Sequence, residues 1–418
     1  MGSMIQLSVG NLQVDWGKNR GFTDHSAFFQ TSDVTLVPYY YVVEGSDYID
    51  EVGETQWKIT VEYKEGLSKP LCEVKDRIAL LGHTIEHCRQ EFMYLANLNN
   101  FDSERFEFES LKVALATVDV SSIALPISEG DEDFGEFFRE QVFPKLGMKL
   151  PDGDTRHVLF SAAEGMENLS SHSVLRLLAE NPTAATLPVI WAYKDLEDGG
   201  WASRDEFVHR LEPSERFLIV TEGSSDAAIL KHALKILKPH IADFFDFIDM
   251  EEGYPFSGTG NLYKFIQGLI SISIQNNVIV LFDNDAEGIF SFNRCSQLNV
   301  PANMRVLKLP DLAEFRFFPT VGPGGQHRLD INGQAAALEC YLQLDDNACI
   351  RWSSFNSNLS TYQGALINKD RYKDCFLGQR SRVADYDYKK IEAVLDMIFD
   401  ACVSLKEFSR TEELGRMP

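Results

Sequence analysis

The stretch RFLIVTEGSSDAAIL (216–230) decides the fold of this chain, together with the stretch NVIVLFDNDAEG (277–288). Each begins with a continuous apolar run, which is typical of a parallel strand buried on both faces. The first run is followed by Glu222 and Asp226, and the second by Asp283 and Asp285. Open α/β sheets bind their ligands beyond the carboxyl ends of their strands, so these four acids are candidate site residues.

The grouping of these carboxylates predicts a bound cation. Carboxylates at one sheet edge repel each other unless a cation lies between them, and Mg²⁺ prefers oxygen ligands. Asp283 and Asp285 are two residues apart, a spacing that lets both side chains reach the same side. An Asx-rich turn is the alternative explanation for that pair, and a helix-capping charge is the alternative for Asp226. Because two neighbouring strands end in acids, we favour the metal site.

The pattern from about residue 212 onward predicts alternating strands and helices with short connections. This pattern predicts a compact parallel sheet flanked by helices, so the expected fold class is α/β. A further helix is expected over QAAALECYLQL (334–344), and an amphipathic helix over KKIEAVLDMIFDACVSL (389–405). The strands are expected over 216–222, 244–250, 278–282 and 304–309, and the helices over 225–238 and 262–274 and from Ala286.

The flanking regions predict different structures. Residues 4–125 are expected to form an α+β domain, because 35–43 and 57–63 alternate like strands and 71–98 has helical spacing. Residues 126–211 are expected to be a helical middle segment, and 346–418 a C-terminal helical extension. This extension holds a basic patch of seven Lys or Arg against four Asp, for which a solvated helix face is an equally good explanation.

Composition limits the function classes. The 418 residues include 39 basic and 63 acidic ones, a net charge of −24 that argues against coating nucleic acid by bulk attraction. A nucleic-acid substrate would need a bound metal, a local basic patch or a partner. The chain shows no transmembrane stretch or signal-peptide pattern, and its seven cysteines form no CxxC pair. A cytoplasmic location without membrane contact is therefore expected.

The motifs VTEG (220–223) and DNDAEG (283–288) resemble those of the Toprim domain, with a match over about 212–345. Toprim domains occur in topoisomerases, bacterial primases, recombination proteins and overcoming-lysogenization-defect (OLD) nucleases, and the EGxxD form here looks closest to the last group. The resemblance implies that Glu222 is the conserved glutamate and that Asp283 and Asp285 bind metal. In such nucleases a further acid completes the site, and Glu339 is the candidate, with an exposed helix acid as the alternative.

This resemblance implies hydrolysis of phosphodiester bonds in DNA or RNA with Mg²⁺ or Mn²⁺. Glu222 would serve as metal ligand or general base, Asp226 as a further ligand, and Lys369 as the cation that binds the phosphate. A surface lysine is the alternative for Lys369. Topoisomerase or primase chemistry remains open, as does a non-catalytic metal-binding scaffold or sensor.

The N-terminal region carries a second resemblance. LSVGNLQVDWGKN (7–19) and EGLSKPLCEVKDRIALLGHT (65–84) look like the N-terminal domain attached to HEPN or Toprim modules in bacterial conflict systems. That resemblance implies a toxic effector of antiphage defence with a protein partner or a homo-oligomeric state. The HEPN ribonuclease signature has no convincing copy, because RDEFVHR (204–210) fits only its spacing.

Three further motifs are weaker. His83 and His87 have the i, i+4 spacing of zinc sites, but HTIEH departs from HExxH, so zinc is disfavoured. SGTGN (257–261) precedes a helix and could hold a phosphate, although a plain turn explains it as well. The chain has no GxxxxGK[ST] motif, so ATP hydrolysis is not expected.

Overall fold

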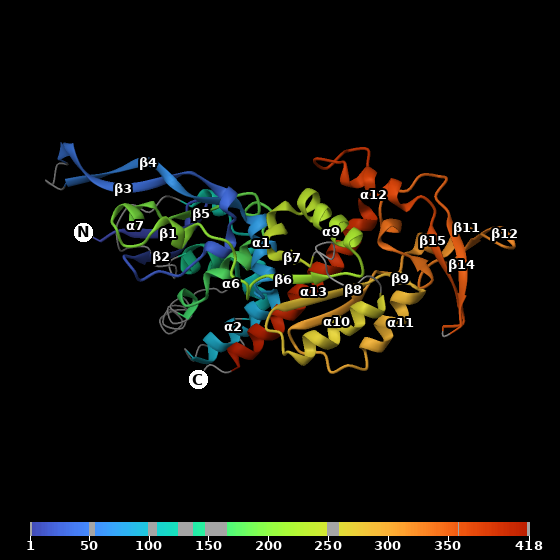
Figure 1. Cartoon of the computed structure of the whole chain (residues 1–418). Helices are drawn as coiled ribbons and strands as arrows, with labels where there is room; N and C mark the ends of the chain where they lie inside the picture. Colours follow the sequence, from blue (N-terminus) through green and yellow to red (C-terminus); the bar gives the residue numbers. More distant parts are fainter. Residues whose placement is uncertain are drawn as a thin grey trace. The chain divides into compact units, whose positions relative to one another are not determined.

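The computed structural model describes residues 2–49, 55–98, 107–123, 137–146, 165–248, 259–357 and 359–415 (Figure 1). The chain divides into two compact units. Unit 1 contains Met1–Arg210 and Lys406–Pro418, and unit 2 contains Leu211–Leu405. The fold is mixed α/β, with an antiparallel sheet in unit 1 and a parallel sheet flanked by helices in unit 2, as the sequence predicts. No helix in the described ranges is long and apolar enough to cross a membrane.

Unit 1 is built on a five-stranded antiparallel sheet with the strand order β2-β1-β5-β4-β3. Its strands are β1 (Met4–Val9), β2 (Leu12–Lys18), β3 (Val34–Ile49), β4 (Thr55–Pro70) and β5 (Pro188–Ala192). Its helices are α1 (Leu71–Leu80), α2 (Ile85–Leu98), α3 (Phe108–Leu115), α6 (Ser171–Leu178), α7 (Lys194–Asp198) and α8 (Arg204–Phe207). The strands expected over 35–43 and 57–63 are thus confirmed as parts of β3 and β4.

Strand β5 lies where only helices were expected. It occupies the centre of the sheet, where Leu67 of β4 and Leu7 of β1 both pair with Trp191. Near the end of the helical segment expected over 126–211, only the single turn of α8 forms. Five residues are too few to show a periodic pattern, and the partners of β5 lie far away in the sequence. The sheet therefore takes residues from both the expected N-terminal domain and the expected middle segment.

The helical pattern of 71–98 forms two helices because the chain turns between them at Gly82. Its φ of +92° is a conformation that side chains rarely adopt. A Cβ atom there would also lie 2.8 Å from the backbone oxygen of Lys406. The turn therefore requires glycine, which ends α1 and allows α2 to start in a new direction.

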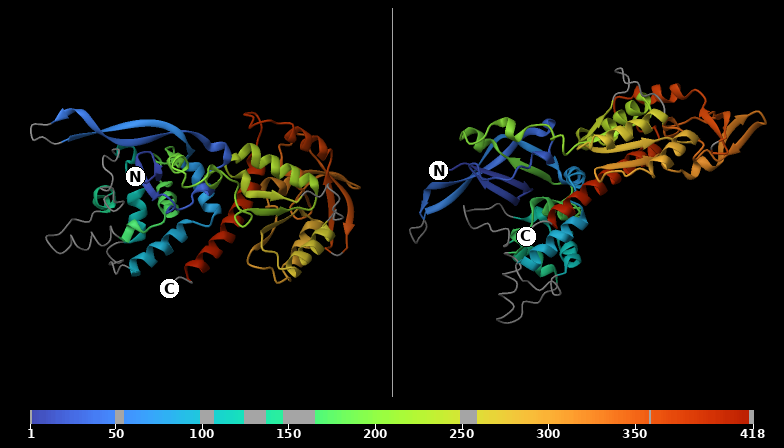
Figure 2. Two further views of the ribbon diagram at one scale, coloured as in Figure 1. Left: turned by 60° about the vertical axis from the view of Figure 1, so that its left-hand side comes forward. Right: turned by 60° about the horizontal axis from the view of Figure 1, so that its bottom comes forward.

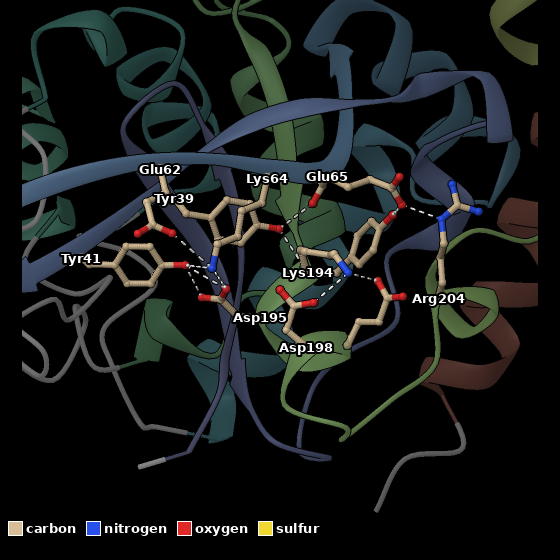
Figure 3. Close-up of polar contacts among 11 residues, drawn as sticks. Tyr39, Tyr41, Glu62, Lys64, Glu65, Lys194, Asp195, Asp198 and Arg204 are labelled. Atoms are coloured by element: carbon tan, nitrogen blue, oxygen red, sulfur yellow. Dashed lines mark hydrogen bonds and ion pairs between the residues drawn. The ribbon is translucent and has the colours of Figure 1, made fainter.

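A partly buried polar cluster fastens the β3–β4 hairpin to α7 (Figure 3). The Lys64 amine donates to the Tyr41 hydroxyl and to Asp195 Oδ1, both at 2.8 Å, and the Tyr41 hydroxyl donates to Asp195 at 2.8 Å. Nearby, the Tyr193 hydroxyl donates to Glu65 Oε1 at 2.6 Å, and Glu65 also pairs with Arg204. Every charged member therefore has a partner of opposite charge, as partly buried charges require.

Unit 2 is built on a four-stranded parallel sheet with the strand order β10-β8-β6-β7. The four expected strands of this sheet and the helices expected over 225–238, over 262–274 and from Ala286 are confirmed, although residues 249–250 of the second strand lie outside the described ranges. The strands are β6 (Phe217–Val220), β7 (Phe245–Phe247), β8 (Asn277–Phe282) and β10 (Met304–Lys308), and the helices are α9 (Ser224–Leu237), α10 (Thr259–Ser271), α11 (Ala286–Cys295), α12 (Lys369–Leu377) and α13 (Lys389–Leu414).

Helices cover both faces of the parallel sheet (Figures 1 and 2). α9 lies over one face, and α10 and α11 lie over the other. All six residues of β8 are buried, which explains why its sequence is apolar without alternation. Val280 and Phe282 of β8 pack with Leu262 and Ile266 of α10 in one hydrophobic cluster.

The remainder of unit 2 differs from the expectation. The helix predicted over 334–344 is wrong: Ala335–Ala336 (β13) pairs with Asn284–Asp285 (β9), and only a 3₁₀ turn, Leu338–Tyr341 (η8), follows. Strand pairing to a distant segment overrides the helix propensity of this stretch.

The segment 346–418, which was expected to be helical, begins with strands before its two helices. They belong to a second sheet, ordered β12-β11-β14-β15, made of β11 (Phe318–Gly322), β12 (Gly325–Leu329), β14 (Ile350–Asn356) and β15 (Thr361–Leu366).

Candidate functional site

The strand order of unit 2 places a topological switch point between β6 and β8. From β6 the chain moves to β7 on one side of the sheet, and from β8 it moves to β10 on the other side. Neighbouring parallel strands whose connections leave in opposite directions form a topological switch point, where open α/β sheets bind ligands. Glu222 follows β6 and Asp283 follows β8, so both acids lie at this point.

Backbone N–H groups hold the acidic loops in place. The N–H of Asp283 donates to Glu222 Oε1 at 3.2 Å and thereby ties the two strand ends together. The N–H of Leu338 donates to Asp283 Oδ1 at 3.1 Å, because β13 runs beside β9. Each of these two carboxylates therefore has one oxygen fixed by the backbone.

Asp226 and Asp285 also start helices. Asp226 lies in the first turn of α9 and accepts from the N–H of Gly223 at 3.2 Å. Asp285 is the N-cap of α11 and accepts from the N–H of Gly288 at 2.7 Å. The helix-capping role that was the alternative for Asp226 is thus present, and Asp285 caps a helix as well. Both acids also lie close enough to the other site acids to interact with them electrostatically. Helix N-termini favour negative charge there.

Glu339 and Lys369 complete the group of predicted residues. Glu339 is only 2% exposed, so it is not an exposed acid, and η8 brings it to the site. Lys369 Nζ lies 3.5 Å from Glu339 Oε1, and the Ser225 hydroxyl donates to the same oxygen at 3.4 Å. All six predicted site residues are therefore brought together in unit 2.

The carboxylates raise one another's pKa values. Burial, followed by the charge of Asp285, raises the pKa of Glu222 to about 8. Burial, followed by the charge of Glu339, raises the pKa of Asp226 to about 7, against the lowering effect of Lys369. Burial also raises the pKa of Asp283 and of Asp285, and Asp226 and Glu222 both add to the effect on Asp283. These groups are crowded, desolvated and short of positive charge.

This donor set fits a hard divalent cation. Carboxylate oxygens are the ligands that Mg²⁺ and Mn²⁺ prefer, and a cation would offset the repulsion that raises these pKa values. Within the described ranges, no three Asp, Glu, His or Cys side chains already lie at the spacing of a metal-ligand set. The side chains would therefore have to move closer together to hold a cation.

Asn284 anchors the acidic loop, a role that sequence reasoning missed. It is fully buried, donates to Asp311 Oδ1 at 2.9 Å and accepts from the N–H of Gly333 at 3.0 Å. Asp311 in turn pairs with Lys308 at 2.7 Å. Asn284 thus anchors the acidic loop between the two metal-candidate aspartates. The only signal in the sequence is its position between Asp283 and Asp285, where it looks like a spacer.

The weaker motifs lie elsewhere. His83 and His87 contact each other in unit 1, with ring centroids 4.8 Å apart, and His83 stacks on His172 at 4.1 Å. Burial, the main cause, lowers the pKa of both His83 and His87, which keeps them neutral. Part of the SGTGN motif lies outside the described residues, and the remainder begins α10. In the basic patch, Arg371 pairs with Asp345 and Arg382 with Glu392, so local acids neutralise part of its charge.

The geometry defines an α/β unit with a group of buried acids at a sheet switch point, in a chain that also contains an antiparallel α+β unit. Residues 1–215, just over half of the chain, match the family HEPN/Toprim N-terminal domain 1, so the chain belongs to this family. The match ends before β6 and therefore does not include the acidic site. It connects the chain to HEPN- and Toprim-related proteins. Neither curated proteins nor solved structures provide a match.

Proposed function

We propose that this protein is a divalent-metal-dependent nuclease of the Toprim kind that hydrolyses phosphodiester bonds in DNA or RNA. The observation that carries the proposal is the group of four carboxylates with raised pKa values at the switch point, Glu222, Asp226, Asp283 and Asp285. Perturbed acids in a ligand crevice are typical of catalytic sites. The family membership supports a function related to nucleic acids.

Each side chain has a role that its position supports. Asp283 and Asp285 would hold Mg²⁺ or Mn²⁺, with Asp226 and Glu339 as further ligands. A bound divalent cation supplies an activated water and neutralises charge on the phosphate. Glu222 would act as a ligand or as a general base. The hydrogen bond that it accepts from the Asp283 N–H keeps it beside the ligands. Lys369 would bind the phosphate from the side of Glu339.

The test is a cleavage assay on plasmid DNA and total tRNA with Mg²⁺ or Mn²⁺. We expect cutting by the wild type and a loss of at least about a hundredfold in Glu222→Gln and Asp283→Asn. Asp396→Asn is the matched control, because Asp396 is an exposed acid of unit 2 that pairs with Lys238 away from the site. Full activity in Asp283→Asn would overturn the proposal. Relaxation of supercoiled plasmid without nicks would replace it with a topoisomerase.

We further propose that, in the cell, the protein acts as a toxic effector of antiphage defence that is kept inactive until infection. The strong acidic surplus supports restraint or docking on a partner, because it opposes unassisted binding to nucleic acid. Expression in bacteria should be toxic when the effector is released from restraint, and Asp283→Asn should remove the toxicity. Equal toxicity of both forms would contradict an enzymatic effector.

A further inference from the structure

The β14–β15 hairpin of unit 2 extends beyond the sheet that carries it (Figure 1). β14 pairs with β11 at Ile350 and Arg351, whereas it pairs with β15 as far as Asn356. From Trp352 outward, the hairpin is therefore a two-stranded ribbon. Isolated two-stranded ribbons are marginally stable in water, so this segment would gain stability from a surface placed against it.

One face of this ribbon carries a row of aromatic rings. A bulge after Trp352 inserts one extra residue, which turns Phe355 to the same face as Trp352. Tyr362 lies between them, with its ring centroid 6.4 Å from that of Trp352 and 5.2 Å from that of Phe355. Phe355 and Tyr362 meet edge to face at 72° and are 55% and 56% exposed. This arrangement leaves flat ring faces open to solvent.

The sheet that carries the ribbon is locally cationic in a strongly acidic chain. The segments 316–329 and 347–369 contain no Asp or Glu, although the whole chain has 63 of them. They contain Arg316, Arg328, Arg351 and Lys369. Arg351 directly precedes Trp352 in regular pairing and therefore lies on the opposite face of β14 from the rings. What this sheet offers a polyanion that also presents flat rings is an aromatic face free of acidic side chains.

The ribbon is continuous with the acidic site. Its base contacts β13, because a Cβ atom on Gly364 would lie 3.2 Å from the Cβ of Ala335, which pairs with Asp285. β15 then leads directly to Lys369, whose amine lies 3.5 Å from Glu339. A ligand extended along the ribbon would therefore reach the candidate site at the base of the hairpin.

We propose that the β14–β15 ribbon is a stacking platform for single-stranded nucleic acid, with unpaired bases on Phe355 and Tyr362. This inference rests on the proposed function and specifies its substrate class. Aromatic side chains stack on bases that are free of a duplex, and such stacking is tolerant of sequence. The ribbon selects single strands or unpaired loops over duplex.

The test is fluorescence anisotropy with short fluorescein-labelled oligonucleotides, single-stranded and duplex, on the full chain carrying Asp283→Asn to prevent cutting. We expect single strands to bind more tightly than duplex. The Phe355→Leu/Tyr362→Leu variant should bind single strands about tenfold more weakly or worse. Tyr63→Leu is the matched control, since Tyr63 is a 67% exposed tyrosine on the β3–β4 hairpin of unit 1.

The outcomes separate this inference from the proposed function. Unchanged binding by the Phe355→Leu/Tyr362→Leu variant, with an unchanged melting temperature, overturns the platform even if the wild type cuts. Equal affinity for duplex and single strands overturns it as well. Conversely, selective binding through the ribbon by a wild-type protein that cuts no substrate supports the platform and refutes the nuclease.

Discussion

The carboxylate of Asp283 experiences the combined repulsion of the other site acids. Burial and the neighbouring Asp226 and Glu222 raise its pKa, so its charged form is costly without a cation. We predict that Asp283→Asn stabilises the cation-free protein, because the amide carries no charge to be desolvated or repelled by its neighbours. Thermal melts with and without Mg²⁺ measure this effect.

The same melts test the ligand role of Asp283. Mg²⁺ should raise the melting temperature of the wild type and of the control Asp396→Asn, but have a much smaller effect on Asp283→Asn. A lower melting temperature of Asp283→Asn in the absence of cation would show that the carboxylate is structural. Such a result would point to the hydrogen bond that Asp283 accepts from the Leu338 N–H.

For individual residues, the sequence predicted most of the candidate site. Glu222 and Asp283 were predictable because continuous apolar strands deliver them to one sheet edge. Glu339 was expected on a helix, yet it reaches the site from a 3₁₀ turn. Asn284 was not predictable as an anchor, because its partner Asp311 comes from a separate loop. Side-chain pairing between distant loops leaves no local pattern.

Helix α11 begins in direct contact with the end of β8, and Gly288 makes this approach possible. A Cβ atom at Gly288 would lie 2.2 Å from the backbone oxygen of Asp283. We therefore predict that Gly288→Ala displaces the acidic loop, lowers the free energy of unfolding by about 1–3 kcal/mol and weakens cation binding. Chemical denaturation and metal titration measure the two effects.

Gly268 provides the matched control for this prediction. It lies inside α10, and a Cβ atom there would meet no atom within 4 Å. Gly268→Ala should raise the free energy of unfolding by about 0.5–1 kcal/mol, because alanine favours the helix. Equal effects of the two substitutions would contradict the proposed contact between α11 and β8.

The elements differ in how well the sequence predicted them. The parallel strands of unit 2 were predictable, because each is a buried apolar run followed by a helical pattern. β5 was not, since a five-residue strand depends on partners far away in the sequence. The second sheet of unit 2 was also missed, because β12 is exposed along its whole length and carries no apolar alternation.

Across the whole molecule, the two units should respond oppositely to pH. In unit 1, burial, the main cause, lowers the pKa of His172 to about 3, and it also lowers the pKa of His83 and His87. Between about pH 3 and 6.5 the unfolded chain therefore binds more protons than the folded unit. Acidification through this window should destabilise unit 1, and its stability should be fully present above it.

Unit 2 should behave in the reverse way when no divalent cation is present. The pKa values of Glu222 and Asp226, about 8 and about 7, lie above their ordinary values. The folded unit therefore binds more protons than the unfolded chain between about pH 4 and 8, so raising the pH lowers its stability. Scanning calorimetry across this range should show two transitions that shift in opposite directions. A common shift of both would contradict the assignment of these groups.

The most direct test of the proposed metal site is a titration of Mn²⁺ into the protein at about pH 7.5. The titration is followed by calorimetry in buffers of different ionisation enthalpy. We predict saturable binding with proton release, because acids with pKa values near 7 and 8 must lose their protons to become ligands. Asp283→Asn should lose this binding, and Asp396→Asn should retain it. Absence of binding by the wild type, or identical binding by Asp283→Asn, would contradict a metal site at this sheet edge.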